Sequence, residues 1–157
     1  MISVGIDPGL SGAIAFFDRD AGTLQVFDMP TVEITRNGKK KNEVAAQALA
    51  LMFRPFVDCQ MSIYLERVNA MKGQGVTSVF SFGRSTGIVE GVVSWLSSPL
   101  TLVAPQLWQK AVGLRDGKDG SRLRAMELFP AYAELFRLKK AHGRSDAALI
   151  AWYGATQ

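Results

Sequence analysis

The stretch MISVGIDPGLSG (residues 1–12) joins a short apolar run to an acidic turn. The run from Ile2 to Ile6 contains no charged residue and predicts a strand buried on both faces. The run stops at Asp7, and the Pro8-Gly9 pair after it is typical of a turn. Forming a turn is an ordinary role for Asp7, so a functional role for this residue depends on whether other acids lie close to it.

The remainder of the chain predicts a single α/β domain, residues 1–157, with no linker or internal repeat. Further strands are expected at residues 12–17, 23–29, 61–66 and 100–105. The spacing of apolar residues predicts helices at 42–57, 76–96, 105–114, 117–129 and 145–155. The early strands follow one another through short turns, whereas the later ones alternate with helices. This order predicts a mixed five-stranded sheet, with its first three strands antiparallel and helices on both faces.

Two segments have an unusual composition. Residues 30–42 are polar, with lysines at 39, 40 and 41, and predict a mobile loop, with Asn42 capping the helix after it. The helix at 76–96 carries Gly83, Gly87 and Gly91 on one stripe, although each glycine costs roughly 1 kcal/mol relative to alanine. That stripe predicts close packing against either the sheet or a second subunit. Three tryptophans are expected in the core: Trp95, Trp108 and Trp152.

The overall composition indicates a globular protein of moderately basic charge. Of its 157 residues, 48% are hydrophobic and 20% are charged, and the net charge is +4. This charge favours a polyanionic partner, although surface lysines and arginines kept for solubility explain it equally well. Cys59 is the only cysteine, which excludes an intramolecular disulfide and a cysteine-based zinc site. The chain shows neither a membrane-length apolar run nor a signal-peptide pattern, so a cytoplasmic location is expected.

Three acidic residues adjoin apolar runs, whereas most of the 14 lie in polar surroundings. Asp7 and Glu66 each end a predicted strand. If these strands are parallel neighbours, both carboxylates lie at the carboxyl edge of the sheet, where open α/β sheets bind ligands. Asp146 lies on the apolar stripe of the last predicted helix, at its N-terminal turn.

Each acid also has an ordinary structural explanation. Asp7 can form a turn, Glu66 can be a surface acid, and Asp146 or Ser145 can cap the helix. Together, however, three carboxylates at one partly buried site would repel one another, and a divalent cation relieves that repulsion with the least strain. Carboxylate and water ligands suit Mg²⁺ or Mn²⁺, and two such ions about 3.5–4 Å apart can cleave a phosphodiester. His142, the only histidine, is either an exposed loop residue or a metal ligand or proton-transfer group beside Asp146.

Six segments, taken in order, resemble the RuvC family of Holliday-junction resolvases, within the RNase H-like superfamily. They are GIDPGLSG (5–12), IYLERV (63–68), GQGVTSVFSFGRSTGIVEG (73–91), VAPQLWQKAVGL (103–114), KDGSRLRAMELFP (118–130) and HGRSDAALIA (142–151). The resemblance covers nearly the whole chain and is greatest to the phage or prophage RuvC-like type. It implies a homodimeric, Mg²⁺-dependent endodeoxyribonuclease, acting in DNA recombination and repair in the cytoplasm of a bacterial host, that nicks four-way or other branched DNA.

By position in these segments, the resemblance implies particular site residues. Asp7, Glu66 and Asp146 match the family's metal ligands, for two Mg²⁺ ions per active site with Mn²⁺ able to substitute. His142 stands where relatives place a fourth acidic or histidine residue, which implies a catalytic role. The residues expected to contact DNA, mainly through its phosphate backbone, are Lys72, Gln74, Arg84, Lys118 and Arg122.

The loop after the second acid departs from the family pattern. The bacterial type carries there an aromatic residue that wedges into the junction, whereas RVNAMKGQG (67–75) has none, and Met71 is a candidate substitute. This difference leaves room for three-way junctions and flaps as substrates.

Two other functions are alternatives to the nuclease. The first is a branched-DNA-binding protein that cleaves weakly or not at all; the three acids disfavour it, because negative charge beside phosphates does not help a pure binder. The second is a sugar-kinase-like ATPase domain, which needs a longer chain and a second glycine-rich phosphate-binding segment.

Overall fold

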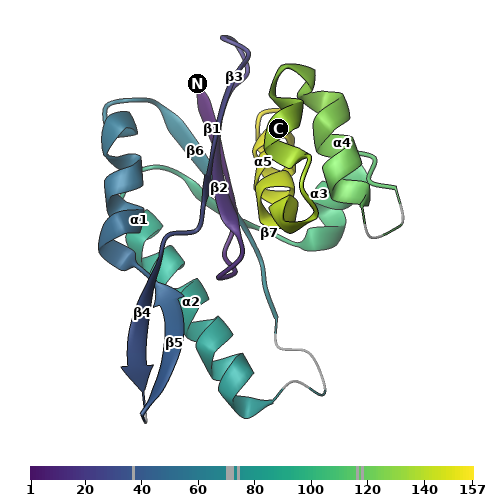
Figure 1. Cartoon of the computed structure of the whole chain (residues 1–157). Helices are drawn as coiled ribbons and strands as arrows, with labels where there is room; N and C mark the ends of the chain where they lie inside the picture. The colour runs from purple at the N-terminus through teal and green to yellow at the C-terminus, as the bar shows by residue number, and fades with distance from the viewer. Residues whose placement is uncertain (37, 70–72, 74, 116, 118) are drawn as a thin grey trace.

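The computed structural model describes residues 1–36, 38–69, 73, 75–115, 117 and 119–157, and it contains the predicted five-stranded sheet (Figure 1). The strands are β1 (Ile2–Asp7), β2 (Ala13–Asp18), β3 (Thr23–Asp28), β6 (Met61–Glu66) and β7 (Leu100–Val103). Their order across the sheet is β3-β2-β1-β6-β7. The first three are antiparallel, while β6 runs parallel to both β1 and β7. The predicted mixed sheet is therefore confirmed.

Helices cover both faces of this sheet (Figure 1). One face carries α1 (Ala46–Phe53), the 3₁₀ helix η1 (Arg54–Phe56) and α2 (Val76–Ser94). The other carries α3 (Pro105–Ala111), α4 (Gly120–Leu128), η2 (Pro130–Phe136), η3 (Lys139–Ala141) and α5 (His142–Gly154). Within the described ranges, no helix has the length and apolar character needed to cross a membrane.

The helix α5 lies directly against β1, because Ser3 and Gly5, on the side of β1 that faces it, are small. A methyl group on Gly5 would overlap the backbone of Ala147 and Ala151, and both alanines are fully buried. Glycine in a strand commonly marks such a close approach of another backbone. On the opposite side, Val4 and Ile6 fill the core toward α1 and α2. The strand predicted at residues 2–6 thus has large side chains on one face and small ones on the other. The face with small side chains is the one that lets α5 approach.

The segment predicted as a mobile loop is a β-hairpin. It consists of β4 (Thr31–Arg36) and β5 (Lys39–Val44), which form a separate two-stranded antiparallel sheet. Asn42 lies within β5, and Ala45 occupies the N-cap position of α1, so the predicted capping role of Asn42 was also wrong. The sequence does contain a hairpin signal, the Asn-Gly pair at 37–38, which follows residues 31–36 that alternate between polar and apolar up to Ile34.

The glycine stripe of α2 faces away from the sheet. A methyl group added at Gly83, Gly87 or Gly91 would meet no described atom within 4 Å, so packing of this stripe on the sheet is ruled out as the reason for the glycines.

Trp95, at the end of α2, is 77% exposed. The prediction that it lies in the core was therefore wrong, whereas Trp108 is 1% exposed, as predicted.

Candidate active site

Asp7 and Glu66 lie side by side at the carboxyl edge of the sheet. Each is the last residue of its strand, and the parallel register of β1 and β6 pairs Ile6 with Leu65, one residue earlier in each strand. The expectation that both carboxylates share one sheet edge is therefore met. Their common position follows from strand order alone, because parallel neighbours end on the same side.

The third acid reaches the same edge from the first turns of α5. Gly143 lets the start of this helix lie against the turn that follows β1, since an added methyl group would overlap the carbonyl of Ser11 and lie 2.7 Å from Cα of Gly12. Because α5 begins at His142, Asp146 is one turn inside the helix. It is therefore not the N-cap, which excludes that explanation for its presence.

Asp7 is a partly buried carboxyl whose charge is poorly compensated. Its Oδ1 accepts a hydrogen bond of 3.2 Å from the backbone N–H of Gly9. Burial nevertheless raises the pKa of Asp7 to about 6; the Gly9 hydrogen bond opposes this shift, and the negative charge of Asp146 adds to it. The turn after β1 thus orients this carboxylate without neutralising it.

Glu66 is held by a tryptophan from a distant part of the chain. The indole Nε1–H of Trp108, in α3, donates a 2.9 Å hydrogen bond to Oε1 of Glu66. The pKa of Glu66 is raised to about 7, mainly by burial and also by the charges of Asp7 and Asp146, against the lowering effect of this hydrogen bond. The sequence placed Trp108 in the core but gave no sign that its polar edge faces an acid.

Asp146 has an unsatisfied oxygen. Its Oδ1 is buried and has no hydrogen-bond partner among the described residues. Burial raises the pKa of this carboxyl, whereas the Ser121 side chain and the nearby His142 lower it. His142 itself is exposed at the first position of α5. A buried polar atom without a partner is costly, so this oxygen is a candidate ligand atom.

The three carboxyls suit a divalent cation by donor type and by electrostatics. They influence one another's pKa, and oxygen-only ligand sets are those that Mg²⁺ and Mn²⁺ prefer. As the side chains lie, no three His, Cys, Asp or Glu residues of the described chain form a group that could hold a metal ion. The arrangement is one in which a cation would supply the positive charge that the surrounding protein does not.

The five residues predicted to contact DNA fall into two groups: three lie outside the described residues, and two make contacts within the protein. Lys72, Gln74 and Lys118, together with the candidate wedge Met71, lie outside the described residues. Arg84 forms a bidentate ion pair with Glu43. Arg122 pairs with Asp119 and donates to the carbonyls of Phe136 and Arg137, and its side chain is only 11% exposed. Both arginines are thus occupied by contacts within the protein, and DNA contacts by these five residues stay predictions.

We expect the Trp108→Phe variant to weaken Mn²⁺ binding by about 10- to 100-fold, the range typical of partners that orient metal ligands. Loss of the indole N–H also removes a contact that lowers the pKa of Glu66. That pKa should rise, so the onset of metal binding should move to higher pH. Calorimetric Mn²⁺ titrations at pH 6, 7 and 8 measure both effects.

Trp152→Phe is the matched control, because Trp152 packs against the same core cluster without a hydrogen bond to the acids. Equal metal affinities and equal pH dependence in the wild type and Trp108→Phe would show that Trp108 only fills space.

Solved structures show which known fold this is. RuvC of T. thermophilus in complex with a Holliday junction substrate matches with a TM-score of 0.62 and 13% identity, covering 99% of this chain and 96% of that one. A second Thermus thermophilus RuvC structure matches with a TM-score of 0.57 and 14% identity over the same shares. The chain therefore has a RuvC-like fold of the RNase H-like type, as the sequence resemblance implied.

Sequence comparison gives a relative that is named as a Holliday junction resolvase. The chloroplastic Holliday junction resolvase MOC1 of Chlamydomonas reinhardtii is 33% identical over 90 residues. This match spans 56% of the present chain but only 10% of the relative. No protein-family model matches the chain. The predicted resemblance to Holliday-junction resolvases is thus confirmed in fold and in part of the sequence.

Proposed function

We propose that this chain is a divalent-metal-dependent endonuclease that nicks Holliday junctions and other branched DNA by hydrolysing phosphodiester bonds. The observation that supports the proposal is that Asp7 and Glu66 end neighbouring parallel strands of a RuvC-like sheet, with Asp146 near enough for its charge to raise the pKa of both. Buried carboxyls with raised pKa values are uncommon outside functional sites.

The three acids share one role in this proposal, and Trp108 and His142 have others. Asp7, Glu66 and Asp146 would hold two Mg²⁺ ions, or Mn²⁺ in their place. Bound metal would activate the attacking water and stabilise the leaving oxygen. Trp108 fixes the orientation of Glu66 through its hydrogen bond to Oε1. His142, exposed one turn before Asp146, would position that carboxylate or transfer a proton.

A branched-DNA-binding protein without cleavage is the alternative. Purified protein should be incubated with labelled four-way, three-way, flap and linear DNA in Mg²⁺, in Mn²⁺ and in EDTA. The nuclease proposal expects metal-dependent nicks, fastest on the branched substrates. Tight binding with no nick in either metal would support the alternative, and equal cleavage of linear DNA would remove structure selectivity.

We further propose that the active protein is a homodimer joined through α2. A four-way junction is resolved by two nicks, which a twofold-symmetric dimer can place at equivalent strands. The exposed stripe of α2 carries the small residues Gly83, Gly87 and Gly91 between Phe80, which is 61% exposed, and Trp95. Glycines let two helices approach closely, and aromatic residues supply apolar area to bury.

The Gly87→Gln variant is expected to sediment as a monomer, whereas the wild type should sediment at twice the 17.1 kDa chain mass. Gln is the better helix former by roughly 0.5–1 kcal/mol, so unfolding of α2 cannot explain a loss of dimer. Ala50→Gln, on the exposed surface of α1, is the control. Analytical ultracentrifugation at micromolar concentration decides, and a monomeric wild type or a dimeric variant would contradict the interface.

A further inference from the structure

The hairpin of β4 and β5 presents two different faces, although it carries three consecutive lysines. Side chains alternate along a strand, and directly paired residues share a face. The register pairs Arg36 with Lys39 and Ile34 with Lys41, while Lys40 is paired with Thr35. Lys39 and Lys41 therefore share one face with Arg36, and Lys40 lies on the other face, where it forms an ion pair of 2.7 Å with Glu33.

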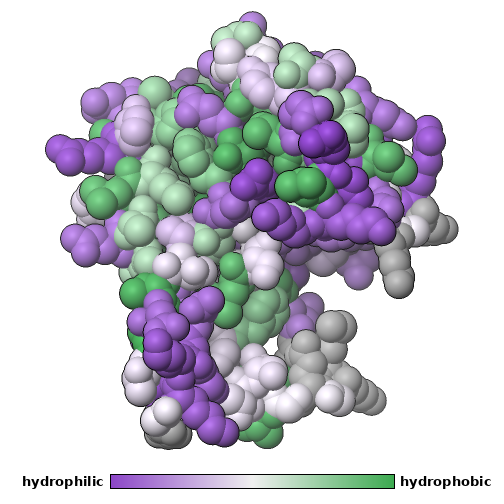
Figure 2. Space-filling view, in the orientation of Figure 1, coloured by the Kyte–Doolittle hydropathy of each residue, from purple (hydrophilic) through white to green (hydrophobic). Residues whose placement is uncertain are grey.

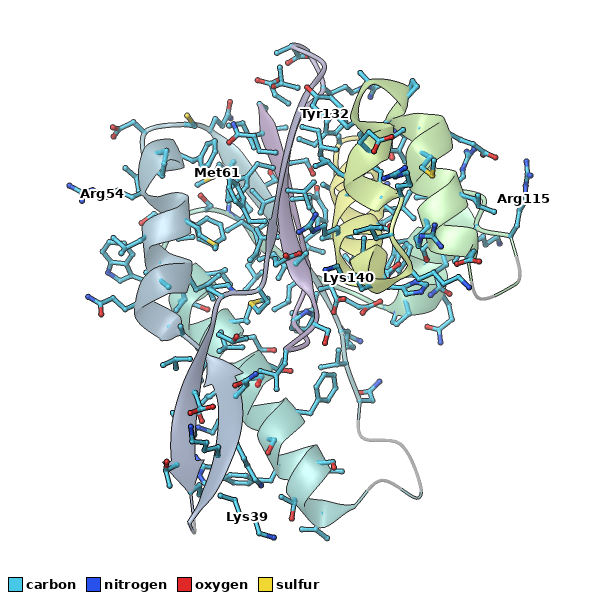
Figure 3. The ribbon with its side chains drawn as sticks, viewed as in Figure 1. Lys39, Arg54, Met61, Arg115, Tyr132 and Lys140 are labelled. Carbon is cyan, nitrogen blue, oxygen red and sulfur yellow. The ribbon has the colours of Figure 1, made fainter. Side chains whose placement is uncertain are left out.

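The face with Lys39 and Lys41 is the one that stands against α2. Glu43, on the same face, accepts a 2.9 Å hydrogen bond from Nη2 of Arg84 in α2 and also pairs with Arg36. The guanidinium of Arg36 lies 5.7 Å from the ring centroid of Phe80. These contacts fix the hairpin relative to α2 and use the negative charge of Glu43 within the protein. Figure 3 shows Lys39 at the end of the hairpin, beside the lower end of α2.

A groove runs between this face and α2. One hollow of about 520 Å³ is lined by the three basic residues Arg36, Lys39 and Lys41 together with Thr77 and Ser81 of α2, among others. A neighbouring hollow of about 490 Å³ shares Lys41, Thr77 and Ser81 as walls. Hydrophilic residues gather over the hairpin in the space-filling view (Figure 2).

The second hollow leads toward the acids. Its far wall is formed by residues 9–11, the turn that follows Asp7. No Asp or Glu is among the described residues that line either hollow, and no ion pair is formed by Lys39 or Lys41 within the described chain. The groove thus combines basic and hydroxyl side chains with the apolar side chains of Leu10, Val76, Phe80 and Phe82, and it ends at the turn beside the candidate active site.

We propose that this groove binds the phosphate backbone of one arm of the DNA substrate and guides it to the active site, with Lys39 and Lys41 contacting phosphates. Lysine ammonium groups and Ser or Thr hydroxyls are common phosphate contacts in DNA-binding proteins. Contacts of this kind would recognise the charge and shape of the phosphate backbone, so they would position the duplex without selecting its sequence. This inference rests on the proposed nuclease function.

Three single variants test it: Lys39→Gln, Lys41→Gln and Lys40→Gln. They make the same chemical change at consecutive positions, but only Lys40 points away from the groove. Junction affinity is measured by fluorescence anisotropy in EDTA, which prevents cleavage, across a series of salt concentrations. Each groove variant should lose roughly 5- to 10-fold in affinity at 0.1 M salt and about one unit of the log Kd against log salt slope. Lys40→Gln should match the wild type.

Thr77→Glu provides an independent test in the opposite wall. A Glu in the first turn of α2 favours the helix through its dipole, so a folding defect is not expected, yet its charge would repel a phosphate in the groove. It should weaken junction binding at least as much as Lys41→Gln. Circular dichroism spectra check that all four variants are folded.

The outcomes separate this inference from the proposed function. Equal losses of junction affinity in all three lysine variants, or no loss in Lys39→Gln and Lys41→Gln, would contradict the proposed role of the groove. Neither result would contradict the proposed nuclease function. A wild type that neither binds nor nicks branched DNA would overturn the nuclease proposal, and the groove with it.

Discussion

Nicking of a four-way junction by the Asp146→Asn variant should be at least about 10³-fold slower than by the wild type. A carboxamide is a neutral and weaker ligand, so the variant loses the metal-borne stabilisation of the transition state. That stabilisation amounts to several kcal/mol, and each 1.36 kcal/mol is tenfold in rate. Single-turnover rates in saturating Mg²⁺ measure the loss. Junction affinity in EDTA should stay within about twofold, because Asp146 contributes no attraction to phosphates.

A second readout of the same variant needs no DNA. Burial raises the pKa of Asp146 above its ordinary value, so the folded state binds its proton more tightly than the unfolded state does. Stability must therefore fall as pH rises past the unfolded pKa, because ionisation then occurs in the unfolded chain first. Asn cannot ionise, so the metal-free variant should melt higher than the metal-free wild type at pH 8 and close to it at pH 4.

Asp58→Asn is the control for both measurements, since Asp58 is exposed and precedes the start of β6, whereas Glu66 lies at the other end of that strand. Near wild-type nicking by Asp146→Asn would remove Asp146 from the set of metal ligands. A lower melting temperature at pH 8 would show that its charge is compensated within the folded protein.

The acids could be found from the sequence because each is marked by its immediate neighbours. Asp7 and Glu66 end short apolar runs, and a parallel pairing of those runs is enough to place both at one edge. Asp146 is marked by helical periodicity, and the periodicity of the apolar residues after it fixes the face on which it lies. Local pattern and one rule of topology were sufficient for these three positions.

The contacts that tune the site depend on residues distant in sequence. Trp108 and Glu66 are 42 positions apart, and Arg84 and Glu43 are 41 apart. Nothing in the neighbourhood of Trp108 indicates that its indole N–H faces a carboxyl, because that depends on where the fold places α3 relative to the end of β6. For the same reason the sequence did not indicate that Arg84 pairs with Glu43 of the hairpin; its DNA contact stays a prediction.

The hairpin itself was missed because charge was given more weight than turn chemistry. Three lysines in a row suggested a solvated loop, although the Asn-Gly pair before them is a strong hairpin signal. Edge strands often carry lysines, which prevent unwanted pairing. Alternation then gave consecutive lysines different surroundings, one in an ion pair and two in a groove.

The Gly143→Ala variant is expected to lose at least about 100-fold in nicking rate although it should remain folded at 25 °C. Alanine favours a helix over glycine by about 1 kcal/mol, so propensity alone predicts a more stable α5. The added methyl group, however, would overlap the carbonyl of Ser11 and lie 2.7–2.9 Å from Gly12. These are backbone atoms, so the start of α5 must move away from the turn after β1, at an overpacking cost of about 1–3 kcal/mol. Asp146 moves with the helix, and a displacement of 1 Å can cost a factor of about 10² in rate.

Gly154→Ala separates positioning from stability in this experiment. Its methyl group would overlap the ring of Tyr64, so it also overpacks α5, but at the end of the helix farthest from Asp146. Both variants should melt a few degrees below the wild type, and only Gly143→Ala should lose nicking and Mn²⁺ affinity. If the two variants lost activity equally, the contact of α5 with the turn would be a matter of stability alone. If Gly143→Ala kept full activity, the carboxylates would not depend on the close approach that Gly143 allows.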